Sequence, residues 1–194
     1  MKRNRWLGML VALVGLSGCV QTLQPAYQAK DLIFEPGLLG VWKDGDSSDS
    51  RGQWEFRRDG KQGYQLVITD NNGKTGKFQA HLARVDDLTL IDLVPERPAV
   101  DASETYLYYL LPTHTFFVVD QLEPELQMRA MNVQWLGKQL EAEPGLLAHE
   151  SRERDKRLLV TASTKELQQF ILQHRNHDEA FGEPSHLVRL ADPR

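Results

Sequence analysis

The chain is poor in cysteine, since Cys19 is the only one among its 194 residues. A single cysteine cannot form an internal disulfide, so no disulfide framework can hold this fold together. The apolar run near the amino end is shorter than the roughly 20 residues that a membrane-spanning helix needs. The sequence also contains no Gly-x-Ser-x-Gly motif, which excludes a serine hydrolase recognisable by that nucleophile signature.

The amino end combines positive charge with a short apolar segment. Three cations within the first five residues precede an apolar run of about eleven residues, which covers 6–16. A short apolar segment behind a charged one is typical of a secretory signal peptide. We therefore predict that the chain is exported, with residues 1–18 as the signal peptide.

The residues around the predicted cleavage site refine this prediction. Leu16-Ser17-Gly18-Cys19 resembles the lipobox of bacterial lipoproteins, in which Leu, a small residue and Gly or Ala precede the cysteine. The resemblance implies cleavage after Gly18, a diacylglycerol on the Cys19 thiol and an acylated amino group. Two or more acyl chains anchor a protein firmly to a membrane, whereas one chain anchors it weakly. The alternative is an ordinary secretory signal with a chance cysteine.

The residue after Cys19 bears on the choice of membrane. In many Gram-negative lipoproteins, an Asp at that position retains the protein in the inner membrane. Here the residue is Val20. The resemblance therefore implies a lipid anchor in the outer membrane with the protein facing the periplasm, provided that the organism has two membranes.

Beyond residue 18 the chain is acidic. Three of its 23 basic residues lie in the predicted signal peptide, which leaves 20 basic against 27 acidic residues. This balance argues against a nucleic-acid partner and against a second, electrostatic attachment to anionic lipid headgroups. We expect a lipidated tether over 19–36 and a single β-rich domain over 37–194.

The first half of that domain predicts an antiparallel meander. Alternating apolar and polar residues predict four strands between about 53 and 94. The turn signals Asp59-Gly60, Asn72-Gly73 and Asp86-Asp87 separate these strands. The residues 88–94 are apolar in both phases, which predicts a bulge or burial on both faces.

The second half predicts more strands and two helices. We expect strands over 105–111, 116–119, 126–131, 158–161 and 187–190, and helices that begin at Asn132 and at Ser163. Gly40-Val41-Trp42 is similar to the Gly-x-Trp that opens the first strand of lipocalins. The predicted fold is therefore mainly β with two helices, an antiparallel meander that forms a lipocalin-like β-barrel of about eight strands. A β-sandwich is the alternative.

Histidines are the main candidates for chemistry. His174 and His177 have the spacing of metal ligands on a helix, but two histidines need a third ligand, so we predict no metal site. His114 enters an apolar strand, where it is either an acid–base group or a buried histidine held by backbone hydrogen bonds. The sequence indicates no cofactor.

Aromatic side chains form the densest apolar group in the sequence. This group contains Tyr106, Tyr108, Tyr109, Phe116 and Phe117. They form either packed core or the wall of a cavity for an apolar ligand, for which we select Tyr106, Tyr108, Phe116 and Phe117.

Three functions are compatible with these patterns. The first is a structural or accessory lipoprotein that docks on another envelope protein through an edge strand or the Trp135 helix. The second is a membrane-tethered barrel that binds an apolar small molecule or lipid. The third is an enzyme centred on His114, which the sequence supports least.

Overall fold

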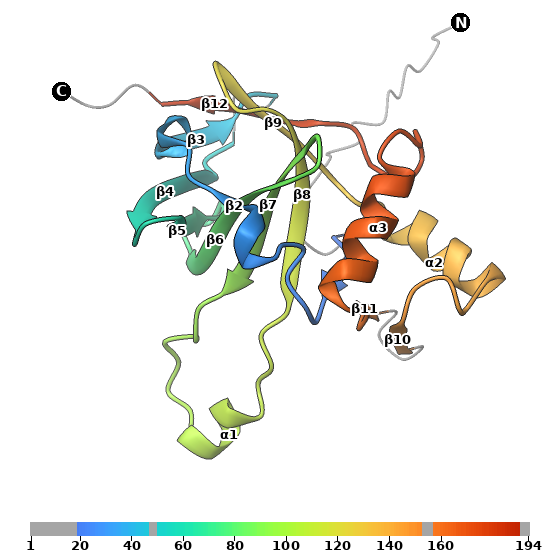
Figure 1. The fold of residues 1–194 in the computed structure, drawn as a ribbon. Helices are drawn as coiled ribbons and strands as arrows, with labels where there is room; N and C mark the ends of the chain where they lie inside the picture. Colours follow the sequence, from blue (N-terminus) through green and yellow to red (C-terminus); the bar gives the residue numbers. More distant parts are fainter. Residues whose placement is uncertain (1–18, 47–49, 153–156, 191–194) are drawn as a thin grey trace, which may run out of the picture.

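The structure is a computed structural model that describes residues 19–46, 50–152 and 157–190. The predicted signal peptide lies outside these residues. Most of the described chain forms a closed antiparallel barrel of eight strands, which confirms the predicted fold class (Figure 1). The barrel strands are β3 (Gly40–Asp44), β4 (Gln53–Asp59), β5 (Gly63–Thr69), β6 (Thr75–Val85), β7 (Leu88–Pro95), β8 (His114–Gln121), β9 (Glu125–Ala130) and β12 (Ser185–Arg189).

Strands β3 to β8 follow one another around the barrel in chain order, as the predicted meander requires. All three predicted turns contain a residue with positive φ: Gly60 at 65°, Gly73 at 78° and Asp86 at 53°. Glycine adopts this conformation without steric cost, and Asp tolerates it better than most residues. The turn chemistry therefore fixes the strand register in this half of the chain.

The carboxyl-terminal strand closes the barrel. In β12, Leu187 pairs with Asp44 of β3 on one side and with Leu126 of β9 on the other. Strand β9 in turn pairs with β8, where Phe117 lies opposite Ala130. Closure leaves the barrel without an unpaired edge.

A small extension of the sheet continues from the beginning of β8. Strand β1 (Gln21–Thr22) lies beside residues 114–115 of β8 and also pairs with β11 (Arg157–Val160). Strand β11 pairs with β10 (His149–Arg152), which ends the sheet. A further short strand, β2 (Leu32–Ile33), pairs with β6.

The predicted tether is wrong. Residues 19–36 contain β1, β2 and a short 3₁₀ helix, η2 (Ala29–Asp31), and a second one, η3 (Pro36–Leu38), follows. Val20 and Ala26 are fully buried, because they pack into the apolar cluster between the barrel and the helices. Residues directly after Cys19 therefore already belong to the folded body.

Two helices match the prediction and cover one side of the barrel (Figure 1). Helix α2 (Val133–Ala142) begins after Asn132, whose side chain accepts hydrogen bonds from the amides of residues 134 and 135. Helix α3 (Thr164–His174) begins with the predicted capping box of Ser163 and Glu166. These caps satisfy amides at the helix starts that have no partner within the helix.

The predicted strand over 105–111 is wrong. These residues contribute instead to a third helix, α1 (Glu104–Tyr108), in a long projection between β7 and β8 (Figure 1). The Ser103 side chain caps α1 by accepting a hydrogen bond from the Tyr106 amide. Strand propensity fails here because β7 has ended and β8 has not yet begun, so the segment has no neighbouring strand with which to pair.

The sheet separates two apolar clusters. The inner cluster fills the barrel, and the outer cluster lies between the barrel and helices α2 and α3. On β7, Leu90 faces the outer cluster, whereas Ile91 and Leu93 face the inner one. Burial on both faces therefore explains the apolar residues in both phases of this strand.

Candidate functional site

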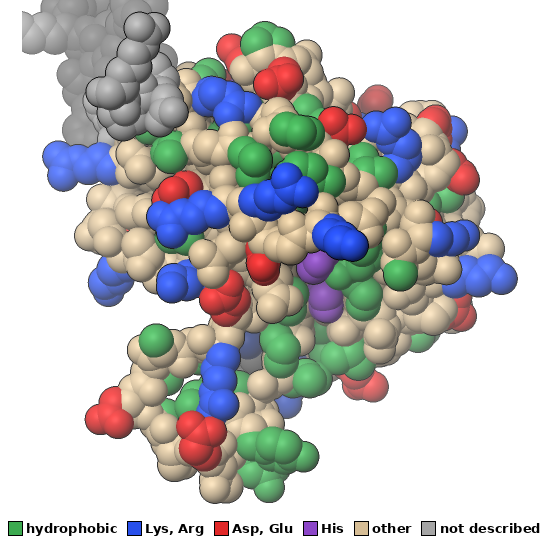
Figure 2. Space-filling view, turned by 60° about the vertical axis from the view of Figure 1, so that its left-hand side comes forward, with side chains coloured by type: hydrophobic (Ala, Val, Ile, Leu, Met, Phe, Trp, Pro, Cys, Tyr) green, Lys and Arg blue, Asp and Glu red, His purple; other side chains and the backbone are tan. Residues whose placement is uncertain are grey.

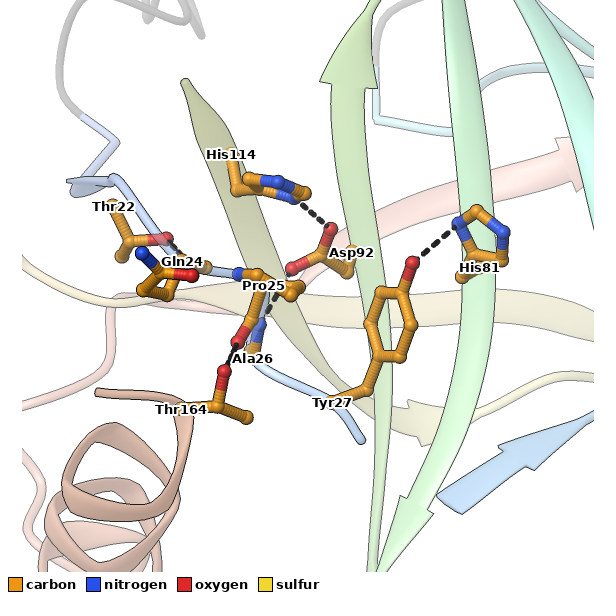
Figure 3. Close-up of polar contacts among 9 residues, drawn as sticks. All are labelled: Thr22, Gln24, Pro25, Ala26, Tyr27, His81, Asp92, His114 and Thr164. Carbon is orange, nitrogen blue, oxygen red and sulfur yellow. Dashed lines mark hydrogen bonds and ion pairs between the residues drawn. The ribbon is translucent and has the colours of Figure 1, made fainter. Parts of the chain in front are cut away.

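A buried carboxylate organises a polar cluster on the outer face of the barrel (Figure 3). Asp92 on β7 is only 1% exposed. Its Oδ1 lies 2.6 Å from Nδ1 of His114, and its Oδ2 accepts a hydrogen bond of 2.8 Å from the Ala26 amide. Both oxygens are thus engaged, as a buried carboxylate requires.

Sheet register brings these residues together. Asp92 pairs with His81 of β6 on one side and with Phe116 of β8 on the other. His114 is two residues before Phe116, so its side chain lies on the same face of β8. Asp92 therefore sits between two histidines on the face that also holds the outer apolar cluster.

His81 forms the second half of the cluster. Its Nδ1 lies 3.1 Å from the Tyr27 hydroxyl. Burial lowers the pKa of His81, although Asp92 opposes this shift. Burial and the charge of Asp92 raise the pKa of Tyr27. Both shifts favour the neutral forms, in which the Tyr27 hydroxyl can donate a hydrogen bond to Nδ1 of His81.

An Asp–His pair can act in acid–base chemistry, because the carboxylate holds one ring nitrogen and leaves the other free to exchange a proton. The His114 side chain is 16% exposed. The nearby hydroxyls of Thr22 and Thr164, however, form hydrogen bonds with the backbone (Figure 3). Thr22 donates to the Gln24 carbonyl, and Thr164 donates to the Pro25 carbonyl. The cluster therefore clamps residues 22–27 onto the barrel.

Sequence reasoning selected His114 but missed its partner Asp92. A usable signal was present, because Asp92 is an acidic residue in the middle of the apolar run 88–94. A charge at such a position is buried on either face, so it requires a hydrogen-bonding partner.

The four predicted cavity-wall residues do not come together. Phe116 and Phe117 are both buried, but they lie on opposite faces of β8, in the outer and inner clusters respectively. Tyr106 and Tyr108 are 59% and 84% exposed on the projection between β7 and β8. The prediction that these four side chains form one cavity wall is therefore wrong.

Side chains occupy the barrel interior. Trp42, Phe56, Leu66 and Leu82 are each at most 1% exposed and belong to the inner cluster. The Trp42 indole donates a hydrogen bond of 2.9 Å to the Leu38 carbonyl, so its polar atom is satisfied. Eight-stranded barrels have interiors of about the size that such side chains fill.

The hollows on the outside of the described fold include the following two. The larger, of about 580 Å³, lies between α2 and the segment 178–184, and its lining includes Arg129, Trp135 and Glu183. The smaller, of about 250 Å³, lies at the turn between β4 and β5 and borders His81. Charged side chains line both hollows, as expected for surfaces that are in contact with water.

His174 and His177 join an aromatic group at the end of α3. The His174 ring centroid lies 4.5 Å from that of Phe170 and 5.1 Å from that of Trp135. Its Nε2 is buried and has no hydrogen-bond partner. Within residues 19–46, 50–152 and 157–190, no three His, Cys, Asp or Glu side chains could together hold a metal ion.

Cys19 lies at the rim of the barrel. Its backbone forms a bridge with Asn132, just beyond the end of β9. The side chain is half-buried beside the inner cluster, and burial raises the pKa of its thiol. Across the described ranges, no helix has the length and apolar character that crossing a membrane would require.

The projection between β7 and β8, residues 96–113, is named the aromatic loop from here on. It carries the exposed large apolar side chains of the described structure: Val100, Tyr106, Tyr108, Tyr109, Leu110 and Leu111. Figure 2 shows this projection standing away from the barrel, with apolar side chains at one corner of its end and charged side chains on the same face. A group of exposed apolar side chains of this kind is typical of a site of interaction with a protein or a membrane.

Comparisons of the chain with family models, with curated proteins and with solved structures found no match.

Proposed function

We propose that this chain is an envelope lipoprotein that is held to the outer membrane by lipid on Cys19 and faces the periplasm. Its role is accessory: it docks on another envelope protein. The lipobox-like sequence before a sole cysteine supports the anchor. The packed barrel interior is the observation that favours docking over ligand transport, because a carrier needs interior volume for its cargo.

Strand β10 is the surface that best fits docking. It pairs with β11 on one side and ends the order of described strands on the other, whereas the barrel strands are paired on both sides. An unpaired edge can accept an extended segment of a partner as an additional strand. Helix α2 fits this role less well, because Trp135 is buried against α3.

A His114-centred acid–base site is the second candidate function. The 2.6 Å contact between Asp92 and His114 favours it. It ranks below docking because the neighbouring hydroxyls of Thr22 and Thr164 are bonded to backbone carbonyls.

The anchor is tested by metabolic labelling with a radioactive fatty acid. The wild-type chain should be labelled and should fractionate with outer-membrane markers on a sucrose gradient. Cys19→Ala should abolish the label and leave the chain unprocessed or misprocessed. Unchanged labelling of the variant would refute lipidation at Cys19, and co-migration with inner-membrane markers would refute the assigned membrane.

Docking is tested with a photoreactive amino acid in place of Ser151 on β10. The matched control carries the same group in place of Lys77, which is also exposed but lies on a strand with neighbours on both sides. Irradiation of intact cells should produce one adduct of defined mass from position 151 and none from position 77. Equal adducts from both positions, or none from either, would contradict docking through β10.

A further inference from the structure

The tip of the aromatic loop has the chemistry of a membrane interface. Tyr108, Tyr109 and Leu111 are 84%, 78% and 67% exposed, and α1 has no buried residue. The stretch 105–113 contains no charged side chain. Tyrosine favours the headgroup level of a bilayer, where its ring is apolar and its hydroxyl meets water, and leucine favours the adjoining acyl region.

The charged residues of the aromatic loop precede this tip sequence, and they are Glu96, Arg97, Asp101 and Glu104. Arg97 forms an ion pair of 2.5 Å with Glu104, so these two charges neutralise each other. Glu96, at the base of the loop, accepts a hydrogen bond from the Gln65 side chain. Asp101 and Glu104 are exposed, so insertion limited to residues 108–111 would leave both carboxylates at the level of the headgroups.

The aromatic loop and Cys19 lie at the same end of the barrel. The loop leaves from the end of β7 and returns at His114, where β8 begins. Cys19 faces Asn132, just beyond the end of β9. Because β8 and β9 are antiparallel, the start of β8 and the end of β9 lie at one end of the barrel.

Because residues 19–36 are folded and do not form a tether, the position of Cys19 determines which end of the barrel lies near the membrane. Cys19 is joined directly to the folded body, since Val20 is buried and β1 follows at Gln21. A lipid on Cys19 would thus hold this end of the barrel close to the bilayer rather than at the end of a long spacer. A weak apolar contact then becomes effective, because attachment turns it into an intramolecular event at high effective concentration.

We propose that the aromatic loop is a second membrane contact, which inserts Tyr108, Tyr109, Leu110 and Leu111 into the interface of the bilayer that holds the lipid on Cys19. The occupant of this surface is the lipid bilayer. Two contacts at one end orient the barrel, whereas a lipid alone would let it rotate. This inference rests on the proposed lipid anchor.

The test uses the full lipidated protein in vesicles of phosphatidylethanolamine and phosphatidylglycerol. Lipidation blocks Cys19, so Leu111→Cys introduces a single free thiol for a fluorophore that reports polarity. Lys61→Cys is the matched control, because Lys61 is exposed in the turn between β4 and β5, at the other end of the barrel. Lipids that carry a nitroxide quencher measure contact with the bilayer.

The label at position 111 should shift to shorter wavelength, and its quenching should exceed that at position 61 several-fold. Adding Tyr108→Asp should reduce quenching at position 111 several-fold, while the protein stays on the vesicles through its lipid. Equal, weak quenching at positions 61 and 111 of vesicle-bound protein would overturn the proposal and assign the loop to a protein partner. Quenching at position 111 that survives Tyr108→Asp would also overturn insertion, since mere proximity would explain it.

Failure of the anchor gives a different result. An unlipidated protein would leave Cys19 reactive toward the fluorophore and would not sediment with the vesicles. That outcome refutes the proposed lipoprotein, and the insertion that rests on it falls with it. Tyr108 is exposed in the folded chain, so Tyr108→Asp should leave the circular dichroism spectrum unchanged.

Discussion

The two apolar clusters of this molecule are built in different ways from one shared sheet. The inner cluster takes its residues mainly from strands β3 to β9, which close around it. The outer cluster joins the amino-terminal segment, as Val20 and Ala26, to residues of α2 and α3 near the other end of the sequence. The barrel thus supplies its own enclosure, whereas the outer cluster depends on docking of distant segments.

Neighbouring phenylalanines on β8 compare the two clusters most directly. Phe117→Ala removes a ring from the inner cluster, and Phe116→Ala removes one from the outer cluster. Each should lower the free energy of unfolding by about 3–5 kcal/mol, because both rings are buried. Urea denaturation, followed by circular dichroism and by tryptophan fluorescence, measures the loss.

The shape of the transition distinguishes one unit from two. If the shared sheet couples the clusters, each variant should unfold in one step with coincident midpoints from both probes. Two separated transitions in Phe116→Ala would show that the outer cluster unfolds independently. A much smaller loss for Phe116→Ala would indicate open space beside this ring and would favour the ligand-binding alternative.

The Asp92 cluster connects the amino-terminal segment to the barrel. Asp92→Ala removes hydrogen bonds to Ala26 and His114 and should cost about 3 kcal/mol in unfolding free energy. Asp120→Ala is the control, since Asp120 pairs with Arg129 in a partly exposed ion pair that should contribute less than about 1 kcal/mol. Equal, small losses would favour a catalytic role for Asp92 over the clamp.

A fall in pH should lower the free energy of unfolding through His174, which packs against the outer cluster. Burial, and then the neighbouring His177, lowers the pKa of His174 in the folded protein. As the pH falls below about 6.5, the unfolded chain binds a proton that folded His174 resists, so stability declines with falling pH. Urea midpoints measured between about pH 7.5 and about pH 5 follow the decline.

His174→Phe should make that pH dependence shallower. It also replaces the partnerless Nε2 with carbon, which should stabilise the protein by about 1 kcal/mol at neutral pH. Gln173→Ala on the exposed face of α3 is the control and should retain the wild-type pH dependence. An unchanged slope in His174→Phe would show that another group, such as His81, governs the response.

Short sequence motifs correctly predicted the turns and the helix starts, because a few neighbouring residues determine these features. The turn residues Gly60, Gly73 and Asp86 adopt positive φ, and the caps at Asn132 and Ser163 begin helices as expected. These features depend on a few consecutive residues and their own hydrogen bonds. The barrel could therefore be anticipated from its hairpins.

Features that depend on distant contacts could not be predicted in this way. The segment 105–111 has strand-like residues but no strand beside it, and 19–36 looks weakly periodic although the sheet and helices bury part of it. His114 was a candidate from its sequence position alone. Its contact with Asp92 arises from the pairing of β7 with β8, which a single sequence does not reveal.

The position of β12 between β3 and β9 sets an order on assembly. Strand β3 pairs with β12 through contacts such as that of Asp44 with Leu187. Its partner is therefore synthesised some 140 residues after β3 itself. A chain emerging amino end first can form its hairpins early, but the ring must stay open until residues 185–189 arrive. During that interval the margins of β3 and β9 are free to pair with other chains, which makes the last strand a safeguard against aggregation during biogenesis.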